Sequence, residues 1–326
     1  MKSFQYIFPK ELQAVPKLLA EYGEKCLLYA GGTDALARMK DGINSPELVI
    51  NLKKIKELGV VKANRKRVEI GAAVRLADLP TDVRVRKFPG LIEAIESVGT
   101  IQLRNMGTIG GNLNQRPRCW YFKSSRFPCL RKGGESCFAI YGENKYHCIL
   151  GGYPCYIVHP SDIAPMLIAL DAEVEILGTK KSRWIKVEDF YVLPSQDPLH
   201  ETVLQRDELV TRILVPQKAG LLKSHYVKFR ERDSFDFAMV SVAVAGQLND
   251  AVLTDMRIVL GGVAPKPWRA RKAEQVLEGQ RMSEDLLLQA ATEELAAAEP
   301  LEQNEYKVIL ARNLMKRAIQ QWADAR

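Results

Sequence analysis

The chain has 326 residues, of which 47% are hydrophobic and 26% charged, and its formal net charge at pH 7 is +8. This length predicts two or three domains, and the composition is typical of a soluble globular protein. We expect no membrane insertion, because no apolar run approaches the roughly 18–20 residues of a membrane helix, and no nucleic-acid binding, because the basic residues form no stripe with interleaved aromatics.

Residues 1–55 predict a small α/β unit that forms the first domain. Short strands are expected at 4–8, 26–30 and 48–52, and an amphipathic helix at 10–22, where Leu12, Val15 and Leu19 recur at helical spacing. The strand at 26–30 runs into a glycine turn, which a helix at 35–40 follows.

The second predicted domain spans residues 56–216 and the third residues 217–326. The second has strands at 67–72, 172–177, 184–187 and 209–215, with helices at 91–98 and 163–170, and Ser161-Asp162 fits the N-cap of the latter. Pro216 marks its end. In the third, apolar segments at 226–229, 238–248 and 256–263 predict a small antiparallel sheet, and helices are expected at 283–299 and 304–325.

Two glycine motifs are candidate ligand loops. In Tyr29-Ala-Gly-Gly-Thr-Asp-Ala-Leu36, a strand ends in glycines and opens a helix, which exposes backbone N–H groups suited to a phosphate. The motif is neither G-x-G-x-x-G nor a Walker A sequence, so neither of those mechanisms applies. The second motif, Thr108-Ile-Gly-Gly-Asn112, also lets a ligand approach the backbone closely. Two such loops suit a dinucleotide, and a pair of purely structural turns is the alternative.

Five of the six cysteines lie in one polar, glycine-containing segment, at positions 119, 129, 137, 148 and 155. Five is odd, so they cannot all pair with one another. The close C-x₂₋₄-C pairs of zinc sites are absent, whereas iron–sulfur clusters tolerate wide spacings. An iron–sulfur cluster is therefore favoured over zinc, while a redox or inert role stays open. His147 and His159 are candidate ligands by proximity alone. No arrangement of a nucleophile with a base stands out.

Taken together, these motifs resemble the FAD-binding (medium) subunit of the xanthine oxidase family of molybdenum hydroxylases, over nearly the whole chain. The resemblance implies an α+β fold: a two-part FAD-binding domain of the vanillyl-alcohol-oxidase/CO-dehydrogenase flavoprotein type, followed by a C-terminal small antiparallel sheet with helices. It also implies that FAD contacts Tyr29, Ala30, Gly31, Gly32, Thr33, Asp34, Ala35, Leu36, Thr108, Gly111, Asn112, Asp162 and Lys228.

Most members of that family run almost directly from the Gly-Gly-Asn loop to the Ser-Asp pair, whereas this chain carries a cysteine-containing insertion at about residues 116–157. Two sub-families bind a [4Fe–4S] cluster at that place, the periplasmic aldehyde oxidoreductases and 4-hydroxybenzoyl-CoA reductase. The motifs around the cysteines and Gly261-Gly-Val-Ala-Pro-Lys-Pro-Trp268 are closer to the aldehyde oxidoreductase type. The implied metal ligands are Cys119, Cys129, Cys137 and Cys155, with Cys148 as the alternative fourth ligand.

We therefore expect an oxidoreductase subunit that passes electrons between a [2Fe–2S] subunit and an external acceptor through FAD, with no catalytic residue of its own beyond the flavin. The expected partners are a large molybdopterin-binding subunit and a small [2Fe–2S] subunit, with a dimer of heterotrimers as one arrangement. The alternatives are a reductase that runs electrons towards molybdenum, or a zinc-stabilised binding protein without a redox role. The N-terminus shows no secretion signal, which favours the cytoplasm, and export with a signal-bearing partner would place the complex in the periplasm.

Overall fold

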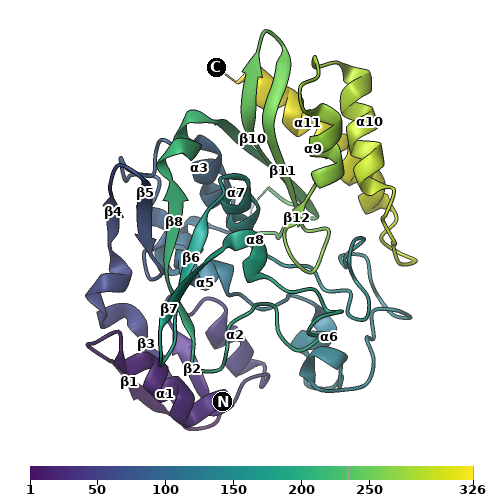
Figure 1. Ribbon diagram of the computed structural model, residues 1–326. Coiled ribbons are helices and arrows are strands. Elements are labelled where there is room, and N and C mark those ends of the chain that lie inside the picture. The colour runs from purple at the N-terminus through teal and green to yellow at the C-terminus, as the bar shows by residue number, and fades with distance from the viewer. Residues whose placement is uncertain (234, 326) are drawn as a thin grey trace.

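A computed structural model describes residues 1–233 and 235–325. It contains three sheets and a long irregular segment that extends to one side of the molecule, at the lower right in Figure 1. Among the described residues, no helix is both long and apolar enough to span a membrane.

The N-terminal sheet is parallel, with strand order β1-β3-β2. Its strands are β1 (Gln5–Ile7), β2 (Cys26–Tyr29) and β3 (Leu48–Asn51), and its helices are α1 (Ala14–Tyr22) and α2 (Ala35–Lys40). All four residues of β3 are buried, as expected for the central strand of a parallel sheet that is covered on both faces. Short 3₁₀ helices at Gly23–Lys25, Leu52–Lys54 and Lys56–Gly59 connect these elements.

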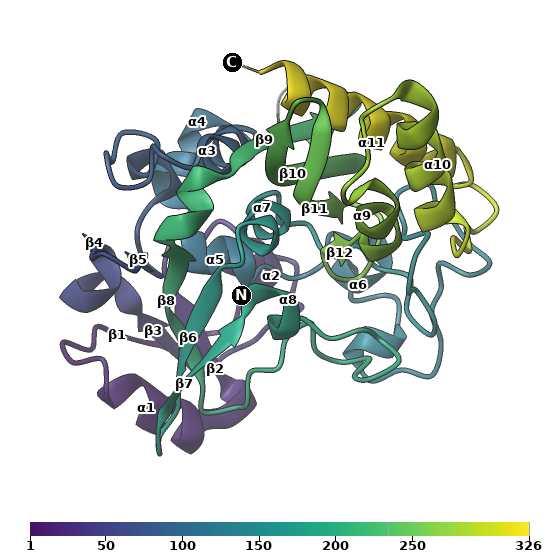
Figure 2. The same ribbon diagram turned by 45° about the horizontal axis from the view of Figure 1, so that its top comes forward.

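The middle sheet is antiparallel, with strand order β4-β5-β8-β6-β7. Its strands are β4 (Val61–Ala63), β5 (Arg67–Gly71), β6 (Glu173–Leu177), β7 (Ser182–Lys186) and β8 (Leu209–Pro216). The helices around it are α3 (Pro89–Glu96), α4 (Ile101–Met106), α5 (Ile109–Leu113), α7 (Ile163–Ala169) and α8 (Val187–Phe190), with 3₁₀ turns at Leu76–Asp78 and Gln217–Leu221. Every residue of α7 is buried, because this helix lies between the middle and C-terminal sheets (Figure 2).

The C-terminal sheet is antiparallel, with strand order β12-β11-β10-β9. It consists of β9 (Lys223–Phe229), β10 (Val240–Asn249), β11 (Val252–Gly261) and β12 (Trp268–Arg269), and the helices on one face are α9 (Arg271–Leu277), α10 (Glu284–Leu295) and α11 (Tyr306–Asp324). In β10 the valines face these helices, while Ala243 and Ala245 face the core that contains α7. Small residues on that face allow α7 to pack closely.

The cysteine segment has little regular structure: helix α6 (Trp120–Lys123) and a 3₁₀ turn at Leu130–Lys132. One sequence expectation changes nearby. The second glycine motif is not an open loop, because helix α5 begins inside it at Ile109, with Thr108 as its N-cap. Helix α9 is an addition to the elements predicted from the sequence.

Candidate functional site

The first glycine motif packs against the backbone of Met106 and Gly107, which leads directly into the second motif. A Cβ atom at Gly31 would lie 2.2 Å from the Met106 carbonyl oxygen and 2.8 Å from the Gly107 Cα, so no larger residue fits there. Gly32 has φ +75°, in the left-handed region that glycine adopts readily. The first turn therefore requires glycine twice, once for space and once for conformation.

The second motif is fixed to the start of α7. The Thr108 hydroxyl accepts a hydrogen bond from the Gly111 N–H (3.2 Å), which caps α5. The Ser161 hydroxyl donates to Asn112 Oδ1 (2.6 Å) and accepts from the Ala164 N–H (3.0 Å). Ser161 thus caps α7 and at the same time orients Asn112, which explains why two motifs about 50 residues apart in sequence meet at one place.

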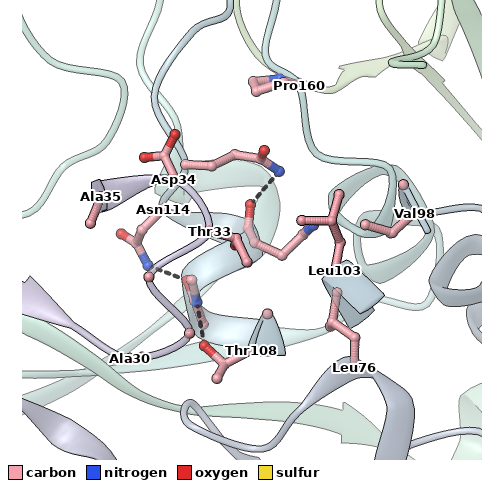
Figure 3. A pocket seen from close by; sticks show the side chains of 18 of the residues that line it. Ala30, Thr33, Asp34, Ala35, Leu76, Val98, Leu103, Thr108, Asn114 and Pro160 are labelled. Atoms are coloured by element: carbon pink, nitrogen blue, oxygen red, sulfur yellow. Dashed lines mark hydrogen bonds between the residues drawn. The ribbon is translucent and has the colours of Figure 1, made fainter. Parts of the chain in front are cut away.

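A cavity of about 440 Å³ opens where the two glycine motifs meet (Figure 3). Most of the residues expected to contact FAD line it: Ala30, Gly31, Gly32, Thr33, Asp34, Ala35, Thr108, Gly111, Asn112 and Asp162. Three expected residues do not line it, namely Tyr29, Leu36 and Lys228. The Tyr29 ring packs beneath Gly32 and so supports the turn from behind.

The opposite wall of this cavity is apolar and has no signature in the sequence. Leu76, Val98 and Leu103 lie together on that side, across from Thr33 and Thr108 (Figure 3). They come from separate turns and helices that only the tertiary fold brings together. The cavity therefore joins a polar half with exposed backbone to an apolar half, which suits a ligand with a diphosphate and a ring system.

Four arginines surround two carboxylates between the first glycine turn and the cysteine segment. Asp34 pairs with Arg38 (Nε–Oδ2 2.9 Å) and with Arg118 (Nη1–Oδ1 2.6 Å). Glu201 pairs with Arg116 (Nε–Oε2 2.8 Å) and with Arg131 (Nη1–Oε1 2.8 Å). These side chains are largely buried, so the excess positive charge favours anions such as phosphate or thiolate. Burial lowers the pKa of Arg116, as do the neighbouring arginines.

A buried ion pair closes the other end of the cavity. The Lys228 ammonium lies 2.7 Å from Asp162 Oδ2, and the two side chains are only 4% and 5% exposed. The Tyr226 hydroxyl also donates to Asp162 (3.0 Å), and Lys228 donates to the Ser97 carbonyl (3.1 Å). Burial raises the pKa of Asp162, against the opposing effect of Lys228. Lys228 does not line the cavity and therefore affects its electrostatics only through the ion pair with Asp162.

Three other cysteines of the segment, Cys119, Cys129 and Cys137, lie near Cys155. Its sulfur hydrogen-bonds with the Cys137 thiol, and together with the Arg131 guanidinium this bond lowers the pKa of Cys155 to about 6. The pKa of Cys119 is raised to about 11, mainly by burial and to a smaller extent by the nearby Cys155 and Cys129 sulfurs. Burial likewise raises the pKa of Cys129. The grouping is loose: among the described residues, no three His, Cys, Asp or Glu side chains are arranged as a metal site.

Cys148 has different surroundings from the other four. Its side chain is fully buried, and a Cβ atom added at Gly152 would lie 2.6 Å from its sulfur. Burial raises the pKa of this thiol, and the buried Lys307 ammonium of α11 opposes the effect. Asn304 donates to the carbonyls of His147 and Cys148 (3.1 Å each), and Lys307 donates to the His147 carbonyl (3.0 Å). Cys148 thus lies where the segment is anchored to the C-terminal helices.

The two candidate histidines are both buried. His147 Nε2 lies 3.3 Å from the Cys119 sulfur, and burial lowers the pKa of His147 to about 4. The His159 ring packs against Tyr191, with 4.4 Å between ring centroids, and burial lowers its pKa to about 3. Both imidazoles are therefore neutral near pH 7.

Comparison with known proteins assigns the chain and its fold to a family. Residues 2–218 match a family model described as "FAD binding domain in molybdopterin dehydrogenase", and residues 224–322 match one described as "CO dehydrogenase flavoprotein C-terminal domain". The chain belongs to the FAD-binding medium subunits of the xanthine oxidase and CO dehydrogenase family. It carries a FAD-binding domain and is an oxidoreductase subunit, which confirms the family, the fold class and the enzyme class expected from the sequence.

Individual relatives agree with this membership. The chain is 36% identical over 291 residues to the aldehyde oxidoreductase FAD-binding subunit PaoB of Escherichia coli strain K12, covering 88% of each chain. It is 29% identical to the glyceraldehyde dehydrogenase medium chain of Sulfolobus acidocaldarius, covering 89% of this chain and 86% of that one. A solved structure of carbon monoxide dehydrogenase from Hydrogenophaga pseudoflava superposes with a TM-score of 0.79 at 26% identity, covering 100% and 99% of the two chains.

Proposed function

We propose that the chain holds FAD and one [4Fe–4S] cluster as the electron-transfer subunit of a heteromeric molybdenum hydroxylase of the aldehyde oxidoreductase type. The single observation that supports this most is the backbone contact between the first glycine motif and the residues that lead into the second, at the head of a two-sided cavity. Similarity to the E. coli aldehyde oxidoreductase subunit supports the choice of type.

FAD fits the residues of the cavity. The backbone of residues 31–34, with Thr108, Gly111 and Asn112, would hold the diphosphate, because no side chain blocks approach to those amides and the surrounding arginines provide positive charge. The apolar wall, with Asp162 and Lys228 at its end, would hold the ring system and exclude water from it. Bound FAD supplies exchange between one-electron and two-electron carriers, and this chain supplies its position and electrostatics.

The donor set of the cysteine segment fits an iron–sulfur cluster in its chemistry. Cys119, Cys129 and Cys137 all lie close enough to Cys155 to interact with it through hydrogen bonding or charge, and thiolates are the ligands that such clusters use. We assign the four ligand roles to these residues. Cys148 also interacts with Cys155 by charge, but its side chain is fully buried against Gly152 beside Lys307, and on that ground we leave it out of the ligand set.

The partners would be a large molybdopterin-binding subunit and a small [2Fe–2S] subunit, with electrons passing from the latter through FAD to an external acceptor. The cytoplasm is the proposed location, with co-export on a partner's signal as the alternative.

Separate replacement of the cysteines tests the ligand assignment. The Cys129→Ser variant, purified anaerobically, is expected to lose most of its iron and the brown absorbance of the cluster, while Cys148→Ser retains both. Cys26→Ser is the matched control, because Cys26 lies in β2, outside the segment. A full complement of iron in Cys129→Ser together with its loss in Cys148→Ser would refute the assignment.

A further inference from the structure

A second cavity, of about 380 Å³, adjoins the flavin cavity. Five residues line both cavities and so form the wall between them: Arg118, Pro160, Asp162, Asp236 and Phe237. The far end of the second cavity reaches Cys119 and His147 of the cysteine segment. A molecule in this cavity would be adjacent to both proposed redox groups.

Aromatic side chains that are only partly covered give this cavity its shape. Trp120, Tyr146 and Phe237 line it and remain 37%, 38% and 44% exposed. The Trp120 ring meets the Tyr146 ring edge-on, with 5.8 Å between centroids, and Met239 adds a buried thioether to the lining. Half-exposed aromatics around a concave surface provide flat apolar contact area that the chain itself leaves unused.

A buried donor without a partner lies in the same lining. Arg118 Nε is buried and makes no hydrogen bond to any described residue, whereas the buried rings of His147 and His159 interact with the backbone of Asn144 and Leu113. The Ser161 N–H donates to His159 Nδ1 (3.3 Å), so the proton of this neutral ring is on Nε2, which is a donor. Unpaired buried donors cost stability, which a ligand with acceptor oxygens would recover.

The charges in the lining favour a neutral ligand. The three carboxylates are those of Asp162, Glu231 and Asp236, and each is already paired: with Lys228, with Lys145 and with Arg232. Arg118 and Arg232 also line the cavity and are paired with Asp34 and Asp236, so among the described residues the lining carries no unpaired charge that would attract an ion. The volume of about 380 Å³ lies near the lower end of the roughly 300–1,000 Å³ of small-molecule pockets and is sufficient for a single ring system.

We propose that this second cavity binds a neutral planar aromatic carbonyl compound, a quinone, as the electron acceptor of the subunit. The inference rests on the proposed flavin function. Flat apolar walls would contact the quinone ring, and the Arg118 Nε–H would donate to one of its carbonyl oxygens. In each turnover the quinone would take two electrons from the reduced flavin and two protons, ultimately from water, and leave as the hydroquinone.

The test is a titration of the flavin-loaded chain with duroquinone, in which calorimetry measures binding. Flavin content is measured separately by absorbance. Duroquinone is chosen because its four methyl groups block addition of the cysteine thiols. The wild-type chain should bind one equivalent. Ala238→Trp, which fills the cavity, and Trp120→Ala, which removes a wall, should each weaken binding at least tenfold and leave flavin content unchanged. Tyr141→Ala is the matched control, since Tyr141 is 98% exposed in the same segment and does not line the cavity.

The remaining outcomes separate the two proposals. Absence of binding by the wild type, or equal binding by both variants, overturns the quinone site. Loss of flavin from Ala238→Trp also overturns it, because the cavity would then hold part of the flavin, and the proposed flavin function would stand. A wild-type chain that never retains flavin contradicts the flavin function instead. If that flavin-free chain still binds duroquinone and Trp120→Ala weakens the binding, the quinone site is still supported.

Discussion

Replacement of Gly31 by alanine tests whether contact between the first glycine motif and the backbone of Met106 and Gly107 is required for flavin binding. Gly31 is buried and has no left-handed backbone angle, so the only effect of the added methyl group is the space it occupies. That methyl group would lie 2.2 Å from the Met106 carbonyl oxygen, whereas ordinary contacts begin at 3.4 Å. The two motifs must therefore separate by about 1 Å, and both belong to rigid backbone.

The expected magnitude follows from this overlap. Inserting a methyl group into a well-packed site typically costs about 1–3 kcal/mol. If the cost appears as displacement of the turn that holds the diphosphate, the Kd for FAD rises roughly 5- to 150-fold, since about 1.4 kcal/mol corresponds to a factor of ten. Quenching of FAD fluorescence on addition of the flavin-free chain measures this Kd directly. Urea denaturation of the same flavin-free chain measures how much of the cost falls on folding.

Gly59→Ala is the matched control for this experiment. Gly59, like Gly31, has no left-handed backbone angle, but it is exposed and a Cβ there meets no atom within 4 Å. This variant should bind FAD as the wild type does. The reasoning is refuted if Gly31→Ala matches the wild type in both FAD affinity and unfolding free energy.

Three further changes have defined outcomes. Arg118→Ala removes a guanidinium that links the cysteine segment to Asp34 of the first glycine turn and lines the cavity. FAD should therefore dissociate about fivefold faster in stopped-flow measurements, which corresponds to a loss of roughly 1 kcal/mol of binding free energy. Lys228→Met leaves Asp162 buried without its cation and should lower the urea unfolding free energy by about 3–5 kcal/mol, most of which a second change, Asp162→Asn, should restore. His225→Gln should destabilise the chain at pH 5.5 by at most about 1 kcal/mol and much less at pH 8.5.

The direction of that pH dependence follows from the hydrogen bond between His225 and Glu93 (2.9 Å), which raises the pKa of His225 above its usual 6.5. A raised histidine pKa stabilises the fold fully below the unfolded value, and this contribution is lost as the pH rises through the folded value. A destabilisation that grows between pH 5.5 and pH 8.5 would contradict the assignment. Unchanged FAD release from Arg118→Ala, or a lack of rescue in the Lys228 and Asp162 double variant, would contradict the other two predictions.

The glycine motifs were predictable from the sequence because the physical requirement at each is local. Gly32 needs a left-handed backbone and Gly31 needs space, and both requirements are met by residue type alone. The lysine at 228 was placed beside the flavin by resemblance, whereas in the structure it contacts Asp162 and does not line the cavity. Its distance from the cavity depends on how β9 packs against α7, which no short motif encodes.

The apolar wall of the flavin cavity was not predictable, for a related reason. Leu76 belongs to a 3₁₀ turn, Leu103 to α4, and Val98 to the connection between α3 and α4, and all three also match ordinary core positions. Arg118 was visible in the sequence only as one basic residue among many. Its bridge to Asp34 depends on the folding of the cysteine segment back towards the first glycine turn. The position of Cys148 beside α11 likewise depends on contacts between parts of the chain that are far apart in the sequence.

The central claim is that one chain carries a flavin and an iron–sulfur cluster, and the most direct test is the cofactor content of the anaerobically purified protein. Flavin absorbance together with iron and zinc analysis gives the amounts of flavin, iron and zinc per chain from one sample. The account predicts yellow-brown protein with about one FAD and about four irons per chain. Colourless protein that contains stoichiometric zinc and no flavin would contradict it.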